Sequence, residues 1–483
     1  MSVSKRILTV LPLLAALVAA PFPASAQPPM PPQAAIRACE GRSTGDTCTL
    51  PSGMAGSCGM TPGGLACVPQ GRGPGMAPSG GSARPGGMAP QERTGRADNM
   101  PSMHGTSMGR AGEAGPSRRP PAYPADADSS PLAERRPIPT GGVPDTNQRL
   151  CFDETHPIAC PAPGQPYYGQ DAQYAGPQPA YRDNGDGTVT DLLTGLTWQR
   201  AHNAERLRYY DAKRSCESLT LGGRDDWRLP SVKELYSLIT FDGAAGVKPY
   251  LDTRYFDIEP PDASFLKNDR FSTHFPEMMG QTWTSTLYAG QLWDRPEEAA
   301  FFVNFLDGRI KCGGTRHPVE LFWRCVRGAP WGANDFEDNG DGTVTDRAVG
   351  LTWQQSDDGK KRDWPEALAY CEELRLGGQD DWRLPNAKEL EYIADYSRVP
   401  ALAPPLRMSD PAGWFWTSTT HGDNVAQADY VCFGKCVSDS GVDVHGAGAQ
   451  RSDPKTMGVK HGSRQGGQED EIRVRNYVRC VRN

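Results

Sequence analysis

Apolar residues along this chain fall into short runs of two kinds. Runs rich in aromatic and β-branched residues predict strands at 188–190, 195–198, 283–286, 300–305 and 321–327. Between such runs, Trp364, Leu368 and Cys371 recur at the spacing that places side chains on one face of a helix. Because strands come first, helices next and further strands last, the pattern predicts an α+β fold rather than a parallel α/β sheet.

Cap residues set the limits of the helices. Asp363 stands three residues before Glu366, with Pro365 in the first turn, which is typical of a capping box at a helix start. Gly377 is expected to end that helix. The same cap spacing predicts a further helix in two places, at the pairs Ser231/Glu234 and Asn386/Glu389.

The whole pattern occurs twice. Residues 183–191 and 338–346 share the sequence Asp-Asn-Gly-Asp-Gly-Thr-Val-Thr-Asp. Further matched pairs stand 155 positions apart: Trp198/Trp353, Cys216/Cys371, Trp227/Trp382 and Cys325/Cys480. Such self-similarity indicates a duplicated unit. We therefore expect two tandem domains, repeat 1 at 181–328 and repeat 2 at 334–483, with the matched tryptophans in their cores.

The two copies differ in their central loops. The segment Trp283-Thr-Ser-Thr matches Trp416-Thr-Ser-Thr at an offset of only 133, so repeat 1 is longer before this point and repeat 2 is longer after it. Variable loops on a constant frame are where binding usually resides. The candidate ligand-binding loops are therefore 242–282, with Tyr250, Tyr255, Phe256 and Phe271, and 437–472, with His445 and His461.

Composition divides the rest of the chain. A basic start, an apolar run and Ala24-Ser25-Ala26 predict a signal peptide at 1–26. No other segment approaches the length of a membrane span. The other expected parts are a flexible segment at 27–38, a small Cys-rich module at 39–69, a disordered Gly/Pro/Met/Arg-rich linker at 70–148 and a lead-in at 149–180. The sequence thus predicts an exported protein, either periplasmic, at the cell surface or secreted.

Export places the 13 cysteines in an oxidising compartment, where pairing is expected. The expected pairs outside the Cys-rich module are Cys151/Cys160, Cys216/Cys325, Cys371/Cys480 and Cys432/Cys436. The second and third of these pairs occupy matched positions, so each repeat should hold one disulfide that closes its frame. Cys312 is left over, as a free thiol or an intermolecular bridge. The sequence has no Cys-x-x-Cys pair, which argues against zinc.

Charge and side-chain chemistry narrow the function. Repeat 1 has a net charge of −2 and repeat 2 of −7, which argues against a nucleic-acid partner. Acidic residues around the repeated turn are calcium candidates: Asp183, Asp186, Asp191, Asp338, Asp341 and Asp346. An EF-hand register would place Arg182 and Leu193 where acids are needed, so a hairpin turn is the favoured interpretation. No histidine recurs at matched positions, and we expect neither a catalytic site nor a cofactor.

Several motifs together resemble one family. They are Gly-Thr-Val-Thr-Asp, Gly-Leu-Thr-Trp-Gln, a helical cysteine, Asp-Trp-Arg-Leu-Pro, Trp-Thr-Ser-Thr and a closing Arg-Cys-Val-Arg, and they resemble the Lcl C-terminal domain family. The resemblance covers both repeats and implies two tandem C-type-lectin-like domains, in which a disulfide joins the first helix to the last strand. A collagen-like bacterial adhesin of that family implies binding to sulfated glycosaminoglycans and trimer formation. This chain lacks a collagen stalk, and its repeats are acidic.

From these observations we expect an exported, non-enzymatic, adhesin-like binding protein with a carbohydrate or another extracellular ligand. Its partner would be an extracellular glycan or a surface protein. From the family resemblance, oligomer formation is a further possibility for this chain. The alternative is a structural or assembly protein of the cell surface that binds other proteins. A third, less favoured interpretation is a cysteine-dependent, oxidase-like enzyme that uses Cys432 and Cys436.

Overall fold

The computed structural model describes residues 142–483 with short gaps, and parts of the preceding chain. The described residues are 39, 42, 46–49, 55–61, 64–69, 136–137, 142–203, 205–243, 248–258, 280–316, 319–422, 424–457 and 470–483. The chain divides into two compact units, Met1–Ala114 and Gly115–Asn483. Within the described ranges, no helix has the length and apolar character needed to cross a membrane.

The first unit contains a small antiparallel sheet within the predicted Cys-rich module. Strands β1 (Thr47–Thr49), β2 (Ala55–Thr61) and β3 (Gly64–Pro69) pair in that order. A disulfide joins Cys39 to Cys58, and Cys48 is disulfide-bonded as well. Such cross-links stabilise a segment that is too short to bury much apolar surface.

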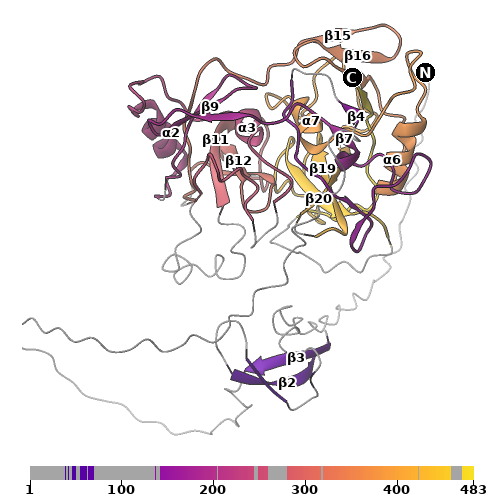
Figure 1. The fold of residues 1–483 in the computed structure, drawn as a ribbon, viewed down its shortest axis with the longest axis horizontal. Helices are drawn as coiled ribbons and strands as arrows, with labels where there is room; N and C mark the ends of the chain where they lie inside the picture. Colours follow the sequence, from indigo (N-terminus) through magenta and orange to yellow (C-terminus); the bar gives the residue numbers. More distant parts are fainter. Residues whose placement is uncertain are drawn as a thin grey trace, which may run out of the picture. The chain divides into compact units, whose positions relative to one another are not determined.

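Each repeat contains a four-stranded sheet that includes its first and last strands (Figure 1). In repeat 1 the order is β14-β10-β9-β8, formed by Val326–Arg327, Thr197–Gln199, Thr188–Asp191 and Tyr181–Asp183. In repeat 2 the matching order is β21-β17-β16-β15, formed by Val481–Arg482, Leu351–Gln354, Thr343–Asp346 and Phe336–Asp338. Because the ends of each repeat pair with each other, each repeat closes as a domain of its own.

A three-stranded sheet and two short helices complete each repeat. The sheet of repeat 1 has the order β11-β12-β13, with bounds Gln281–Leu287, Ala299–Asn304 and Ile310–Gly314. Its counterpart in repeat 2 has the order β18-β19-β20, with bounds Trp414–Thr420, Gln427–Cys432 and Gln450–Pro454. Helices α2 (Tyr209–Glu217) and α3 (Val232–Tyr236) correspond to α6 (Trp364–Glu373) and α7 (Ala387–Tyr392). The predictions of an α+β class and of two tandem domains are confirmed.

The predicted helix starts are confirmed, and one predicted helix end is wrong. Capping boxes form at all three predicted places, with Ser231, Asp363 and Asn386 as the N-cap residues. Helix α6 stops at Glu373 rather than near Gly377, because Leu374 takes an extended conformation. Gly377, with a φ of 60°, belongs to the turn that follows. The expected strand at 321–327 is also shorter, since only Val326–Arg327 forms one.

The duplicated tryptophans and cysteines form the cores of the repeats, as predicted. Trp198, Trp227, Trp353 and Trp382 are all buried. Disulfides join Cys216 to Cys325 and Cys371 to Cys480, and each spans 109 residues. Each connects the first helix of its repeat to the residue that precedes its last strand. Cys312 on β13 remains a free, buried thiol.

Residues 142–148 correct the predicted limit of the linker. They were expected to be disordered, yet Gln148 is buried and hydrogen bonds to the backbone of Thr420, 272 residues further along the chain. The Gln148 side chain donates to the Thr420 carbonyl at 2.7 Å and accepts from its amide at 2.9 Å. Composition predicted disorder because hydrogen-bond partners this far along the chain cannot be recognised in the local sequence. From here on, "lead-in" denotes residues 142–180.

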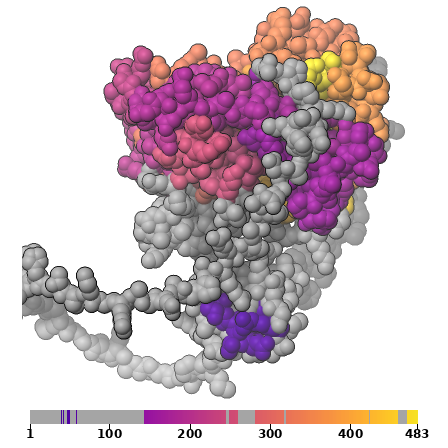
Figure 2. Space-filling model, viewed as in Figure 1, coloured from indigo at the N-terminus to yellow at the C-terminus, as the bar shows by residue number. Residues whose placement is uncertain are grey.

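The lead-in consists of short elements that lie against repeat 2. Its elements are β5 (Cys151–Phe152), β6 (Pro157–Ile158), the 3-10 helix η2 (Asp171–Gln173) and β7 (Tyr174–Ala175), which pairs with β4 (Arg136–Pro137). The predicted disulfide between Cys151 and Cys160 is present. Helix η2 contacts β18 of repeat 2, and the purple surface of the lead-in borders the orange surface of that repeat (Figure 2).

The two repeats pack through equivalent elements. Helix α3 contacts α7, and β13 contacts β20. Matched lysines show the same relation, because Lys233 lies 5.0 Å from the ring centre of Tyr392 while Lys388 donates to the carbonyl of Ser237 at 2.9 Å. Positions 233 and 388 correspond, as do 237 and 392. An interface in which like meets like has approximate two-fold symmetry, as in a homodimer.

Candidate functional site

The described aromatic residues of loop 242–282, which were candidates for ligand binding, are buried or half-buried in the fold. Tyr250 and Phe256 are fully buried, so the prediction that they stack on a ligand is wrong. Tyr250 packs on His421 of repeat 2, with ring centres 6.3 Å apart. Tyr255 is half-buried against Tyr181. Phe271 and His461 lie outside the described residues.

His445 was expected in a polar binding loop, but it lies in a buried ionic cluster. Its Nε2 is 3.1 Å from Asp470 Oδ1, and that carboxylate also pairs with Arg451 on β20 at 2.9 Å. Burial, with Arg451 nearby, lowers the pKa of His445 to about 3, so the imidazole is neutral. Much of the expected loop 437–472 is therefore core, because Gln450–Pro454 forms a buried strand.

The acidic residues of the repeated turn hold the turn itself. Asp183 accepts from the Gly185 amide at 2.9 Å, and Asp186 accepts from the Thr188 amide at 3.1 Å. Asp191 is buried and accepts from two further amides. In repeat 2, Asp338 and Asp341 make the same turn bonds, and Asp346 is likewise buried and bonded to amides. These contacts support the hairpin interpretation over calcium.

A metal-like grouping occurs elsewhere, among Cys39, Cys48 and Cys58. In the part of the chain that the structure describes, no other His, Cys, Asp or Glu group has ligand atoms close enough to share an ion. The three cysteines are disulfide-bonded, which removes the thiolates that zinc requires. The grouping is therefore a structural cross-link.

A cavity lies in a cleft on repeat 1, at its boundary with repeat 2. Its floor begins at the start of α3, where the capping box fixes Glu234. Arg228 donates two hydrogen bonds to that carboxylate, at 2.6 and 2.7 Å, and the Trp331 amide donates a third at 3.0 Å. These bonds lower the pKa of the buried Glu234 carboxyl, although desolvation opposes them. The start of α3 is thus held rigidly.

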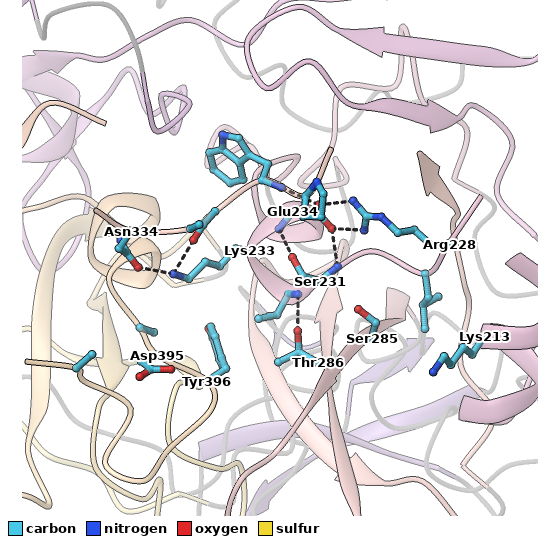
Figure 3. Close-up of a pocket in the computed structure, with 18 of the residues that line it drawn as sticks. Lys213, Arg228, Ser231, Lys233, Glu234, Ser285, Thr286, Asn334, Asp395 and Tyr396 are labelled. Carbon is cyan, nitrogen blue, oxygen red and sulfur yellow. Dashed lines mark hydrogen bonds and ion pairs between the residues drawn. The ribbon is translucent and has the colours of Figure 1, made fainter. Parts of the chain in front are cut away.

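Lys233 anchors the segment that connects the repeats along one side of the cleft. Its ammonium donates to the Gly332 carbonyl at 3.0 Å and to Asn334 Oδ1 at 2.9 Å (Figure 3). Desolvation lowers the pKa of Lys233 to about 8. This lysine serves the interface between the repeats rather than solvent.

The open part of the cleft has polar groups and aromatic edges. It has a volume of about 770 Å³, and its walls include Ser285 and Thr286 on β11, facing Asp395 and Tyr396 of repeat 2 (Figure 3). Lys213 and Glu217 on α2 also line it; neither forms a hydrogen bond or ion pair with any residue described here. Trp331 and Phe336 contribute further aromatic surface. A lining that holds both uncommitted charges and aromatic rings suits a polar ligand.

None of the residues that line this cleft was among the candidate ligand-binding residues named from the sequence. The candidate loops were chosen for their unequal lengths, whereas the cleft is formed by matched frame elements, α2, α3 and β11. A signal was present in the alignment of the repeats, because Lys213 stands where repeat 2 has Leu368. A charged residue in place of an apolar one indicates that the two equivalent faces have different surroundings.

Comparison with known proteins gives one match. The family model described as the Lcl C-terminal domain matches residues 187–327 and 342–482. Together the two matched segments cover more than half of the chain and coincide with the two repeats. No curated protein and no solved structure matches the chain significantly.

Proposed function

This chain belongs to the Lcl C-terminal domain family, and we propose that it is an exported, non-enzymatic binding protein that holds an extracellular ligand in the cleft of repeat 1. The observation behind this proposal is the cleft of about 770 Å³, whose lining includes both the uncommitted Lys213 and Glu217 and several aromatic side chains. Its volume falls within the range of roughly 300–1,000 Å³ typical of ligand sites.

The chemistry of the lining favours binding over catalysis. Among the described residues that line the cleft, none is a histidine or cysteine, so its serines lack the usual general base. Ser231 is used as a helix cap, and the Arg228–Glu234 pair is used to hold the loop. Cys432 and Cys436 are disulfide-bonded and fully buried, which gives a cysteine-dependent enzyme little support.

The proposed domain type is C-type-lectin-like, in line with the family resemblance. In both repeats a disulfide runs from the first helix to the residue directly before the last strand, which matches the pairing that this resemblance implies. Export is supported by disulfides in both compact units, since such bonds persist in oxidising compartments.

A glycan is the first ligand class to test. Trp331 and Tyr396 line the cleft with aromatic surface that a sugar could contact, and Lys213, Glu217 and Asp395 offer charged partners for hydroxyl groups. The experiment is a glycan array probed with the full chain, in calcium and again in EDTA. Binding should survive EDTA, because the turn carboxylates are occupied by backbone amides.

The decisive variant is Ser285→Trp, which places a bulky ring in the cleft; Ser285→Ala is the matched control that keeps the cleft open. Glycan capture that is lost in the first variant and retained in the second would support the proposal. Capture unaffected by Ser285→Trp would place the ligand elsewhere and contradict it. A second candidate, binding of other surface proteins, is favoured by the contacts of the lead-in on repeat 2.

A further inference from the structure

The cleft of repeat 1 has a structural counterpart in repeat 2. Its polar floor is formed by Glu217, Arg228, Lys233, Ser285 and Thr286, and the matched positions are Glu372, Arg383, Lys388, Ser418 and Thr419. The first three pairs follow the offset of 155, and the last two follow the offset of 133 set by the Trp-Thr-Ser-Thr motif. We call this second set the repeat 2 groove. Duplication therefore provides two versions of one surface.

The lead-in fills the repeat 2 groove with the 3-10 helix η2 and the residues on either side of it. Thr419 donates its hydroxyl hydrogen to Asp171 Oδ2 at 2.6 Å. The hydroxyl of Tyr174 donates to the carboxylate of Glu372. Lys388 donates to the carbonyl of Asp145 at 3.1 Å.

The ring of Tyr174 makes a further contact, because the guanidinium of Arg383 lies 5.3 Å from its centre. Asp171 is the first residue of η2 and Tyr174 directly follows its last residue, so one short segment supplies both anchors. Recognition in the groove therefore uses one carboxylate and one tyrosine.

Exposure distinguishes the two versions. The side chain of Arg383 is 3 % exposed beneath the lead-in, whereas that of Arg228 is 31 % exposed. Thr419 is fully buried, whereas Thr286 is only partly buried. The same floor is thus covered by polypeptide in one repeat and accessible in the other.

We propose, building on the proposed function, that the cleft of repeat 1 binds a segment of another exported protein that forms one 3-10 turn, as η2 does, and presents aspartate and tyrosine three residues apart on one face. The aspartate accepts a hydrogen bond from Thr286. The tyrosine donates to Glu217 and lies over Arg228. Lys213, which replaces the apolar Leu368 of repeat 2, favours a further acidic residue in the segment.

The segment that connects the repeats does not take the place of this partner. Its contacts are made with Lys233 and Glu234, through Gly332, Asn334 and Trp331. It therefore covers the side of the floor that corresponds to Lys388 and leaves Glu217 and Thr286 accessible. A partner segment of about the size of η2 and β7 would complete the match with repeat 2.

The test uses a synthetic peptide of residues 165–178, labelled and titrated against the full chain by fluorescence anisotropy. Peptides with Asp171→Asn or Tyr174→Phe should each bind about tenfold more weakly, because each loses one charge-assisted hydrogen bond. On the protein, Glu217→Ala should weaken binding by about tenfold for the same reason. Ser285→Trp should abolish binding, and Ser285→Ala should leave it unchanged.

The matched control is Glu372→Ala in the repeat 2 groove. It should leave the affinity for added peptide unchanged, because the tethered lead-in competes at an effective concentration in the millimolar range. Peptide binding that responds to Glu372→Ala and not to Ser285→Trp would mean exchange with the lead-in, and would overturn the proposal. Circular dichroism on each variant separates loss of binding from loss of folding.

The remaining outcomes separate this inference from the function on which it rests. Absence of peptide binding, with glycan capture that Ser285→Trp removes, would overturn the peptide proposal and keep the cleft as a glycan site. Absence of both would overturn both. Peptide binding with the predicted variant pattern would support both and identify the ligand class as protein.

Discussion

Replacing Asp171 with alanine should release the lead-in from repeat 2. The Asp171 carboxylate is buried and accepts hydrogen bonds from the hydroxyls of Thr146 at 2.8 Å and Thr419 at 2.6 Å. A hydrogen bond to a charged group contributes about 1.5–3 kcal/mol, and removal leaves both donors without this acceptor. Because both bonds end on one oxygen, we expect a combined loss of about 3 kcal/mol rather than the sum.

The buried charge has a second role. Asp171 is among the carboxylates that favour the protonated form of Lys388, whose pKa desolvation lowers to about 8. Without Asp171 the lysine is costlier to keep charged in this groove. Both effects weaken the contact between the lead-in and repeat 2; repeat 1 is reached through Lys388, which donates to the carbonyl of Ser237.

Hydrogen exchange measured by mass spectrometry is the assay. A loss of about 3 kcal/mol should speed exchange in segments 142–150 and 168–176 by about a hundredfold, if those amides exchange through local detachment. Asp153→Ala is the matched control, because the hydrogen bonds to the Asp153 side chain all come from Thr155 and His156 of its own turn. Unchanged exchange in the two segments would refute the reasoning, as would an equal increase throughout both repeats.

Two further predictions concern the frame and the interface. Replacing Cys216 and Cys325, or Cys371 and Cys480, with serine should lower the free energy of unfolding by about 5 kcal/mol in either repeat, because both disulfides span 109 residues. Urea unfolding of the two double variants is the measurement. Midpoints that differ widely between them would contradict a loop-entropy origin. Desolvation raises the pKa of Glu391 from 4.5 to about 7, so stability should fall as pH rises between these values, when only the unfolded chain ionises. The wild-type protein should therefore lose about 3 kcal/mol of stability between pH 5 and 8 through this residue, and the Glu391→Gln variant should not show that loss. Thermal unfolding of both proteins at the two pH values would check this.

Much of the frame could be predicted from sequence because its signals are local or duplicated. Helix starts were visible in the capping boxes at Ser231 and Asn386, which depend on residues three apart. The frame disulfides were visible because the two pairs recur at one offset. Whether a loop residue binds a ligand could not be predicted from the sequence in this way. An aromatic residue such as Tyr250 has the same sequence signature whether it binds a ligand or packs against His421.

By itself, the sequence determined the duplication, the α+β class, the tryptophan cores and the cysteine pairs of the repeats. Each of these depends on periodicity, spacing or repetition within the chain. Only the tertiary structure decided that residues 142–148 are folded, that β20 is core, and that the two copies of one surface differ in exposure. The reason is physical: these features arise from contacts such as Asp171 with Thr419, 248 residues apart, which no local pattern encodes.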